Sequence, residues 1–208
     1  GKGARSYEDV MRKYWHVERG SLVEQLQLQQ GMRALIATVG TGLDLPYFPA
    51  GVDVIGIDYT NEMLEEARIK QSPANLDLKV MDMHDLTFPD NYFDAVLSTF
   101  TFCALRDPKR ALDEMLRVSK PGARIVVCDY TCSRNPKIKK WQELFQYHAS
   151  SVGFPKDVIV WNSLMDYDNL IYNSGLLIKV ESDERIDSDD PNYNPFSTAC
   201  QIILRNEK

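Results

Sequence analysis

The sequence has few of the features that assign a protein to a specialised class. No apolar run approaches the roughly 20 residues that a membrane-spanning helix needs. The start, Gly1–Arg5, has neither Met nor the apolar stretch of a signal peptide, and we interpret it as a trimmed or tagged end. Basic residues are in the minority, with 24 Lys and Arg against 30 Asp and Glu. We therefore expect neither a transmembrane segment nor a nucleic-acid partner.

Cysteine is also scarce, and its spacing argues against a metal site. The four cysteines form no C-x-x-C pair, and the three histidines lie far from them in the sequence. Most of the cysteines lie in apolar stretches, which favours buried thiols in a reducing cytoplasm. We expect no metal, and a cytoplasmic location. The cysteines are Cys103, Cys128, Cys132 and Cys200.

What the chain does contain is typical of one globular domain. It has 208 residues, of which 44% are apolar and 26% charged. We expect residues 1–31 to form an N-terminal helical cap or lid, with helices at 7–20 and 22–30, and residues 32–208 to form the main domain. The aromatic side chains of the first helix fit a lid over a ligand and packing against a sheet edge equally well. They are Tyr7, Tyr14 and Trp15.

Short apolar runs alternate with helical patterns through the middle of the chain. A helix is predicted at 61–70, and another begins with Asp107 as N-cap and Pro108 at the first helical position. Strands that run apolar and alternate with helices indicate an α/β fold, in which helices cover both faces of a parallel sheet. The predicted strands are 34–39, 52–58, 76–81, 93–99 and 124–130.

The last third of the chain follows another pattern. Residues 137–151 look helical, and residues 153–173 look irregular and aromatic. Two final strands are predicted at 176–180 and 198–204. Their connection, 181–195, is polar and too short for a helical crossover, so we expect an antiparallel pair. We expect its acidic part, 181–190, to be a solvated loop.

The ends of the predicted strands carry the residues with chemical potential. In an open parallel sheet, ligands bind at the carboxyl ends of the strands. The glycines at 40 and 42 would let the backbone approach a ligand, and an acid after the second strand can accept ribose hydroxyls. Each residue alone is equally well explained as a turn or a cap, whereas their order together indicates a nucleoside ligand. The strands end in Gly40-Thr41-Gly42, Asp58, Asp82 and Ser98-Thr99.

Five motifs within residues 34–130 strengthen this interpretation. With them the chain resembles the class I S-adenosylmethionine-dependent methyltransferases, in particular the small-molecule branch of quinone- and phospholipid-methylating enzymes (ubiquinone/menaquinone-biosynthesis-like, methyltransferase type 11). Residues 131–208 match only in general layout. The motifs are Gly40–Pro46, Gly56–Asp58 with Glu62–Leu64, Met81–Asp90, Tyr92–Val96 and Leu116–Gly122.

The resemblance implies a fold, a cofactor and a binding site. It implies a Rossmann-like, seven-stranded, mostly parallel sheet with the last strand antiparallel, and S-adenosylmethionine as cofactor. Asp58 would bind the ribose, Asp82 and the Met83 backbone the adenine edge, and the backbone around Ser98 and Thr99 the methionine end. Beside the adenine would lie Tyr59 and Met63. The glycine loop would contribute Thr38, Gly40 and Gly42.

Two departures from the family pattern keep other hypotheses open. Ile36 stands at the usual acid of the first motif, and Thr38 stands at its first glycine. Many relatives carry His-His where this chain has Cys103-Ala104. A non-catalytic, methyltransferase-like binding or partner subunit with weakened cofactor binding is therefore the second hypothesis. A dinucleotide-dependent oxidoreductase is disfavoured because a full G-x-G-x-x-G is missing.

The favoured prediction is methyl transfer to a small, apolar or aromatic acceptor, without an assigned catalytic residue. Candidate bases are His148, His16 and Tyr130, each of which fits ordinary packing or exposure better. An apolar acceptor pocket within residues 154–172 and core packing are equal alternatives. A basic cluster fits an anionic acceptor, peripheral contact with a membrane surface, or a solvated helix face. Its members are Arg134, Lys137, Lys139 and Lys140.

Overall fold

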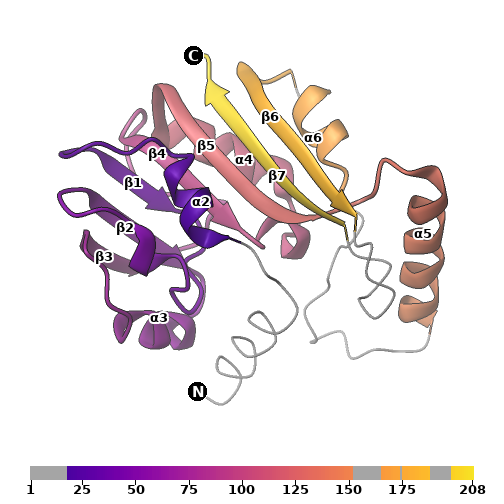
Figure 1. The fold of residues 1–208 in the computed structure, drawn as a ribbon, viewed down its shortest axis with the longest axis horizontal. Coiled ribbons are helices and arrows are strands. Elements are labelled where there is room, and N and C mark those ends of the chain that lie inside the picture. Colours follow the sequence, from indigo (N-terminus) through magenta and orange to yellow (C-terminus); the bar gives the residue numbers. More distant parts are fainter. Residues whose placement is uncertain (1–17, 152–164, 174, 188–197) are drawn as a thin grey trace.

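A computed structural model describes residues 18–151, 165–173, 175–187 and 198–208, and these form one sheet with flanking helices (Figure 1). The sheet has seven strands in the order β3-β2-β1-β4-β5-β7-β6. The strands are β1 (Arg33–Ile36), β2 (Asp53–Asp58), β3 (Asn75–Val80), β4 (Phe93–Thr99), β5 (Ser119–Thr131), β6 (Ile178–Asp187) and β7 (Thr198–Asn206). The helices are α2 (Arg19–Glu24), α3 (Asn61–Arg68), α4 (Pro108–Val118), α5 (Pro136–Ser151) and α6 (Tyr167–Tyr172), with 3-10 turns η1 (Leu45–Tyr47) and η2 (Phe102–Ala104).

Strand direction follows the expected Rossmann-like pattern. The first five strands pair in parallel, with Ile36 opposite Gly56 and Leu97 opposite Val126. β7 lies between β5 and β6 and is antiparallel to both. The predicted parallel sheet and the predicted antiparallel pair of final strands are therefore confirmed.

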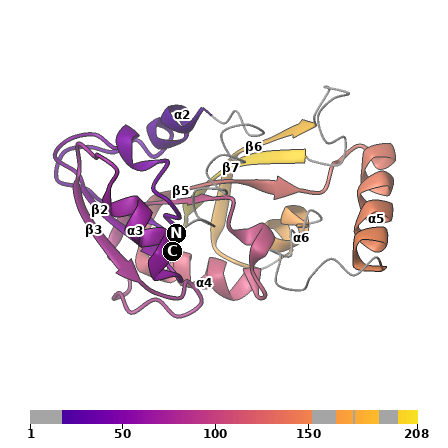
Figure 2. The ribbon, with the colours of Figure 1, turned by 90° about the horizontal axis from the view of Figure 1, so that it is seen from below.

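Helices cover both faces of the sheet, as predicted. Apolar side chains of α2 and α3 share one buried cluster with one face of β1, β2, β4 and β5. Side chains of α4 and α6 share a second cluster with the opposite face. Figure 2 shows α2 on one side of the sheet, with α4 and α6 on the other. The carboxyl ends of the parallel strands are thus held between two packed layers.

Helix α4 begins where the sequence predicts. Oδ1 of Asp107 accepts a hydrogen bond from the Arg110 amide at 3.0 Å, and Pro108 takes the first helical position. The helix ends at Val118, and β5 starts directly after it. This strand is longer than predicted because a register shift after Phe93 accommodates its early residues, which include Gly122 at φ +78°.

The acidic run after residue 180 is a strand and not the predicted loop. β6 extends to Asp187 because its acids are paired: Asp183 lies 2.6 Å from Arg185, and Glu181 lies 2.6 Å from Arg205. Charge pairing makes an edge strand with acidic side chains stable, and such charges also discourage pairing with other chains.

Two helices also differ from the sequence-based expectation. α6 lies inside the stretch predicted to be irregular, where the Asp166 side chain caps it by accepting from the Asn169 amide at 3.0 Å. α2 spans Arg19–Glu24 instead of 22–30, and the chain leaves it through Gln27 at φ +53°. In α6, apolar burial and the Asp166 cap outweigh the weak helical pattern of the sequence, whereas α2 has no side-chain cap and is held by the burial of Leu22 and Val23.

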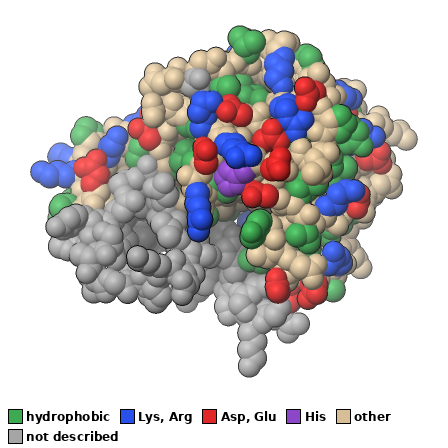
Figure 3. Space-filling model, turned by 180° about the vertical axis from the view of Figure 1, so that it is seen from behind, with side chains coloured by type: hydrophobic (Ala, Val, Ile, Leu, Met, Phe, Trp, Pro, Cys, Tyr) green, Lys and Arg blue, Asp and Glu red, His purple; other side chains and the backbone are tan. Residues whose placement is uncertain are grey.

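Charged side chains on the α4 side of the molecule are interspersed rather than segregated. Lys109 pairs with Asp113 at 2.8 Å, and Arg117 pairs with both Asp90 and Glu114 at 2.8 Å. Figure 3 shows acidic and basic side chains alternating over the face opposite to that of Figure 1. Within the described ranges, no helix is long and apolar enough to cross a membrane.

Candidate functional site

The glycine loop after β1 meets the acid at the end of β2. The Val39 amide donates to the Ile57 carbonyl at 2.7 Å, which ties the loop to β2. Gly40 has φ +55°, and a Cβ built on it would meet no atom within 4 Å. Its amide donates to Oδ2 of Asp58 at 3.0 Å. Two residues predicted from separate motifs therefore touch, beside open space.

Gly42 is needed for a different reason. It has φ +82°, and a Cβ on it would lie 2.7 Å from Cδ1 of Leu45 and 3.1 Å from Cα of Ala67 in α3. Gly42 thus lets α3 pack closely against the loop, whereas Gly40 leaves space where a ligand can approach.

The half-buried carboxylate of Asp58 keeps capacity for a ligand. Its Oδ1 accepts from the amide and the hydroxyl of Thr60, each at 3.0 Å, and its Oδ2 accepts from Gly40. A carboxylate offers about four acceptor positions, so one is left, and the exposed Thr60 hydroxyl can rotate to release another. Asp58 can therefore accept two hydroxyl groups while it still holds the loop.

The predicted adenine wall lies open beside Asp58. The Tyr59 side chain is 73% exposed, and Met63 is partly buried. Oδ1 of Asp82 accepts from the His84 amide at 2.8 Å and lies 2.7 Å from the His84 ring Nδ1. The hydrogen bond from the His84 amide lowers the pKa of Asp82 and keeps its carboxyl group ionised. In the described part of the chain, Oδ2 of Asp82 and the Met83 amide make no hydrogen bond.

A small cavity of about 30 Å³ lies on the other side of the glycine loop. Asp44, which is 2% exposed, borders it; its Oδ1 lies 2.7 Å from Nη1 of Arg19, and its Oδ2 accepts from Thr99 Oγ1 at 2.9 Å. The buried hydroxyl of Thr41 also borders the cavity and has no partner among the described residues. A buried polar atom without a partner indicates a place for a polar ligand or water.

The two departures from the family motif do not block the site. Ile36 is fully buried in the core cluster on the α2 side of the sheet. The Thr38 hydroxyl lies on the cavity wall and hydrogen-bonds the hydroxyl of Thr101, which follows β4. Thr38 therefore links the loop after β1 to the loop after β4.

The backbone after β4 is strained at Phe100. This residue has φ +51°, a conformation that bulky side chains rarely adopt. Its amide donates to the Cys128 carbonyl at 2.7 Å, and its ring centroid lies 5.2 Å from that of Tyr130. Strain of this kind persists where surrounding contacts enforce it, and here it borders the cavity.

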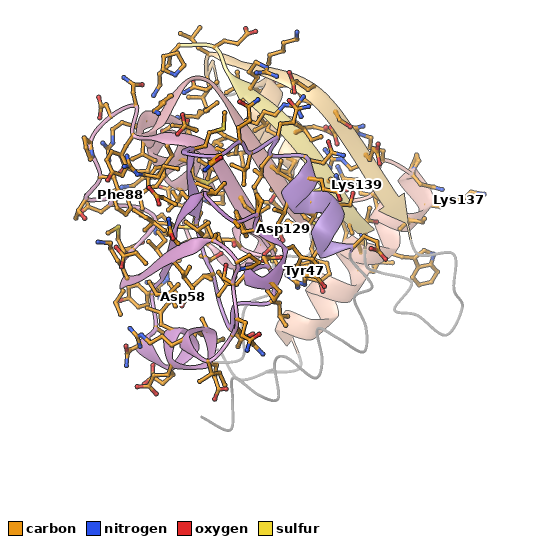
Figure 4. All side chains as sticks on the ribbon, turned by 60° about the vertical axis from the view of Figure 1, so that its left-hand side comes forward. Tyr47, Asp58, Phe88, Asp129, Lys137 and Lys139 are labelled. Atoms are coloured by element: carbon orange, nitrogen blue, oxygen red, sulfur yellow. The ribbon has the colours of Figure 1, made fainter. Side chains whose placement is uncertain are left out.

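A fully buried acid in β5 organises the neighbouring loop. Oδ2 of Asp129 accepts from the Thr101 and Cys103 amides, at 3.1 and 3.2 Å, and from the Tyr167 hydroxyl at 3.0 Å. Burial raises the pKa of this carboxyl, although its hydrogen bonds oppose that rise. Figure 4 shows Asp58 and Asp129 on separate parts of the sheet. Asp129 holds η2 in place at a distance from the nucleoside side.

Sequence reasoning missed four residues of this site: Arg19, Asp44, Thr101 and Asp129. A signal existed for the two acids, since Asp44 follows the Gly-Thr-Gly turn and Asp129 interrupts an apolar strand. No pattern links Arg19 to Asp44, because they lie 25 residues apart and meet only in the fold.

Of the three candidate bases, the structure describes the side chain of Tyr130 alone. Tyr130 is 3% exposed and packs against Phe100. His16, Tyr7, Tyr14, Trp15 and the His148 side chain lie outside the described residues, as does most of the stretch predicted to wall the acceptor pocket. The basic cluster divides, because Arg134 pairs with Asp168 and Asp183 while Lys137 and Lys140 are exposed. Ser98 is fully buried in β4, and Thr99 borders the cavity.

These residues fit S-adenosylmethionine chemically. The space at Gly40, the spare acceptor positions of Asp58 and the unbonded Oδ2 of Asp82 suit the hydroxyl and amino groups of adenosine. The partnerless Thr41 hydroxyl suits a polar tail beyond the loop. The cavity on this side is small, about 30 Å³, and is lined by Arg19, Asp44 and Thr99.

Comparisons with known proteins identify the same domain. Residues 35–127 match the methyltransferase domain family. Over 154 residues the chain is 32% identical to a demethylmenaquinone methyltransferase of Paenarthrobacter aurescens, covering 68% of this chain and 59% of the relative. Over 135 residues it is 32% identical to a phosphatidylethanolamine N-methyltransferase of Cereibacter sphaeroides, covering 63% of this chain and 66% of the relative. The chain thus spans less than two thirds of either relative.

The fold is shared with solved methyltransferase structures. A SAM-dependent methyltransferase from Aquifex aeolicus superposes with a TM-score of 0.66 at 17% identity, covering 98% of this chain and 97% of that one. A SAM-dependent methyltransferase from Methanosarcina mazei gives a TM-score of 0.63 at 18% identity, covering 86% and 93%. These likenesses show the fold. Together with the match of residues 35–127, they support a class I S-adenosylmethionine-dependent methyltransferase domain and imply S-adenosylmethionine as its cofactor.

Proposed function

We propose that this protein transfers a methyl group from S-adenosylmethionine to a small, apolar or aromatic acceptor. The contact between the Gly40 amide and Asp58 carries the proposal, because it joins the glycine loop and the ribose acid beside open space. Two relatives are named for methylating demethylmenaquinone and phosphatidylethanolamine, and both names support an apolar acceptor.

The chain's own residues would bind and orient rather than react. Asp58 would accept hydrogen bonds from the ribose hydroxyls, and Oδ2 of Asp82 would accept from the adenine amine. The Met83 amide would donate to the adenine edge, with Tyr59 and Met63 beside the ring. When bound, the cofactor supplies a sulfonium methyl, which passes to an acceptor nucleophile in a single displacement. Alignment of the reacting groups can lower the barrier of such a step by several kcal/mol, about 7–11 kcal/mol in the best intramolecular models.

We assign no catalytic base. The Tyr130 hydroxyl is buried and its ring packs against Phe100. An acceptor that arrives ionised, such as a thiolate or a phenolate, needs no base, whereas an amine must first lose a proton. We propose ionised thiols and phenols as acceptors because their transfer needs no base.

The N-terminal region and the cell compartment complete the proposal. We propose that residues 1–31 cap the cofactor site, which is supported by Arg19 of α2 at the cavity wall. The four cysteines are free and buried, which suits a reducing compartment, and we propose the cytoplasm as the location.

A non-catalytic binding or partner subunit is the second candidate. One observation favours it: the cavity beside the glycine loop holds only about 30 Å³, and the paired side chains of Arg19 and Asp44 line it. Under this hypothesis the pair stays closed and neither the cofactor nor its product binds.

Calorimetric titration with S-adenosylmethionine and S-adenosylhomocysteine separates the two candidates. We expect micromolar affinity or better for both ligands, and loss of binding in Asp58→Ala. The matched control is Asp53→Ala, at the exposed opposite end of the same strand, which should keep the affinity. Silence with both ligands would leave the binding subunit, and unchanged affinity in Asp58→Ala would refute the placement of the ribose.

A screen of acceptors tests the reaction itself. Thiols, phenols and amines of increasing apolar size would be incubated with the protein and S-adenosylmethionine, and methylated products counted by mass spectrometry. We expect turnover with apolar thiols or phenols and none with Asp58→Ala. Turnover restricted to charged, polar amines would contradict the proposed acceptor class.

A further inference from the structure

The Arg19–Asp44 ion pair is unusual for its burial and its position. Its side chains are 14% and 2% exposed, and they join α2 to the loop after the glycines at the wall of the 30 Å³ cavity. Removing two charges from water is costly, and a packed apolar pair would fill the same space at lower cost. A role in recognising a charged ligand explains why charges stand there.

The pair is arranged so that both charged groups border the same cavity. Oδ1 of Asp44 faces the guanidinium, and Oδ2 accepts from Thr99 at 2.9 Å. The Thr41 hydroxyl on the same wall is buried without a partner among the described residues. The cavity thus offers an anion, a cation and the partnerless hydroxyl of Thr41.

Resting on the proposed function, we infer that this ion pair binds the amino-acid end of the cofactor. That end carries an ammonium and a carboxylate on one carbon, which is the charge complement of a carboxylate and a guanidinium. On binding, Asp44 takes the ammonium and Arg19 takes the carboxylate, so that each buried charge exchanges one ionic partner for another. Asp44 thereby supplies a carboxylate beside the glycine loop. The position of the usual acid of the family motif holds the buried Ile36 instead.

The exchange requires Arg19 to move. In the structure the Arg19 guanidinium lies 2.7 Å from Oδ1 of Asp44, the oxygen that would take the ammonium. Asp44 is fixed by Thr99 and by its place beside η1, whereas Arg19 projects from the short helix α2. The Arg19 side chain therefore swings out and returns onto the ligand, which links the position of this α2 side chain to the presence of the cofactor.

The test uses ligands that differ only in the amino-acid end. S-adenosylhomocysteine has the complete end, 5′-methylthioadenosine lacks it, and decarboxylated S-adenosylmethionine lacks the carboxylate alone. Calorimetry would measure each ligand on the wild type, Arg19→Gln and Asp44→Asn. Lys109→Gln and Asp113→Asn each remove one charge from an exposed ion pair on α4, and they provide controls with the same change of charge.

We expect both site variants to weaken S-adenosylhomocysteine roughly 10- to 100-fold, the size of a hydrogen bond between charged groups. Affinity for 5′-methylthioadenosine should stay within about twofold, which also shows that each variant is folded. The affinity for decarboxylated S-adenosylmethionine should fall in Asp44→Asn and not in Arg19→Gln. The control variants should change none of the three ligands.

Two results would overturn the inference. Equal weakening of S-adenosylhomocysteine and 5′-methylthioadenosine would show that the pair supports the fold and not the amino-acid end. Unchanged affinity in both variants would show that the pair does not bind it. Either of these two results, in a wild type that binds S-adenosylhomocysteine, would remove this inference alone. A wild type that binds neither S-adenosylmethionine nor S-adenosylhomocysteine would remove the proposed function as well.

Discussion

Gly42→Ala and Gly40→Ala form a matched pair that separates packing from ligand access. Both glycines lie in one loop at positive φ, +82° and +55°. A Cβ at position 42 would lie 2.7 Å from Cδ1 of Leu45 and 3.1 Å from Cα of Ala67, whereas a Cβ at position 40 meets nothing within 4 Å. The two variants therefore share the backbone cost and differ in the steric cost.

The expected magnitudes follow from these distances. A left-handed backbone costs an alanine about 1–2 kcal/mol, and both variants lose this amount. At position 42 the new methyl must also displace Leu45, which is fully buried, or the backbone of α3. Overpacking of this kind costs about 1–3 kcal/mol more. Gly42→Ala should thus lower the free energy of unfolding by about 2–5 kcal/mol, and Gly40→Ala by about 1–2 kcal/mol.

Urea denaturation followed by circular dichroism measures the difference. Gly40→Ala should also weaken the binding of S-adenosylhomocysteine by more than the small loss of protein stability explains, because the new methyl group enters the space kept for the ligand. If Gly42→Ala costs no more free energy than Gly40→Ala, the close approach of α3 to the loop is wrong. If Gly40→Ala binds the ligand normally, the open space at this residue is not part of the site.

Three further predictions concern buried groups. Tyr167→Phe removes a donor from the buried carboxyl of Asp129 and should cost about 1–3 kcal/mol in urea denaturation. The hydrogen bond from Arg117 lowers the pKa of Glu114 below its usual value near 4.5. The stabilisation from ionised Glu114 is therefore present above pH 4.5 and is lost as the pH falls through the lowered pKa. Glu114→Gln should thus flatten the fall of the urea midpoint below pH 4.5. Burial raises the pKa of Cys128 to about 12, so native protein should not react with a thiol reagent at pH 8 until it unfolds.

Each of these predictions has its own control. Tyr172→Phe removes an exposed hydroxyl and should cost little, and equal losses in Tyr167→Phe and Tyr172→Phe would contradict the buried network. Glu62→Gln alters an exposed acid of α3, and an acid profile that changes as much as in Glu114→Gln would refute the assigned cause. Rapid labelling of native thiols would show that the cysteines are not buried.

The sequence predicts the order and direction of the strands because the signals are local. Apolar runs mark β2, β3 and β4 within a residue or two, and Asp107-Pro108 marks the start of α4. Where the outcome depends on distant partners, prediction fails. The acids of β6 resemble a loop until Arg205 comes beside Glu181, and α6 needs the sheet face that buries Tyr167.

The candidate site divides in the same way. Asp58 and Gly40 follow from motifs at the ends of strands, and the structure brings them into contact. Their roles toward the ribose, and those of Asp82 and Met83 toward adenine, stay predictions. Arg19 and Thr101 could not be found from sequence, since each matters only through a partner 25 or more residues away.

The position of β7 has a consequence for how the chain is made. Along the sequence β6 precedes β7, yet in the sheet β6 is joined to the rest only through β7. During translation, β6 therefore leaves the ribosome before β7, the strand with which it pairs, has been made. Until then β5 has an open edge with which other chains can pair. Completion of the sheet depends on β7, so a nascent chain that stalls before residue 198 exposes the free edge of β5 and an unpaired β6 to aggregation.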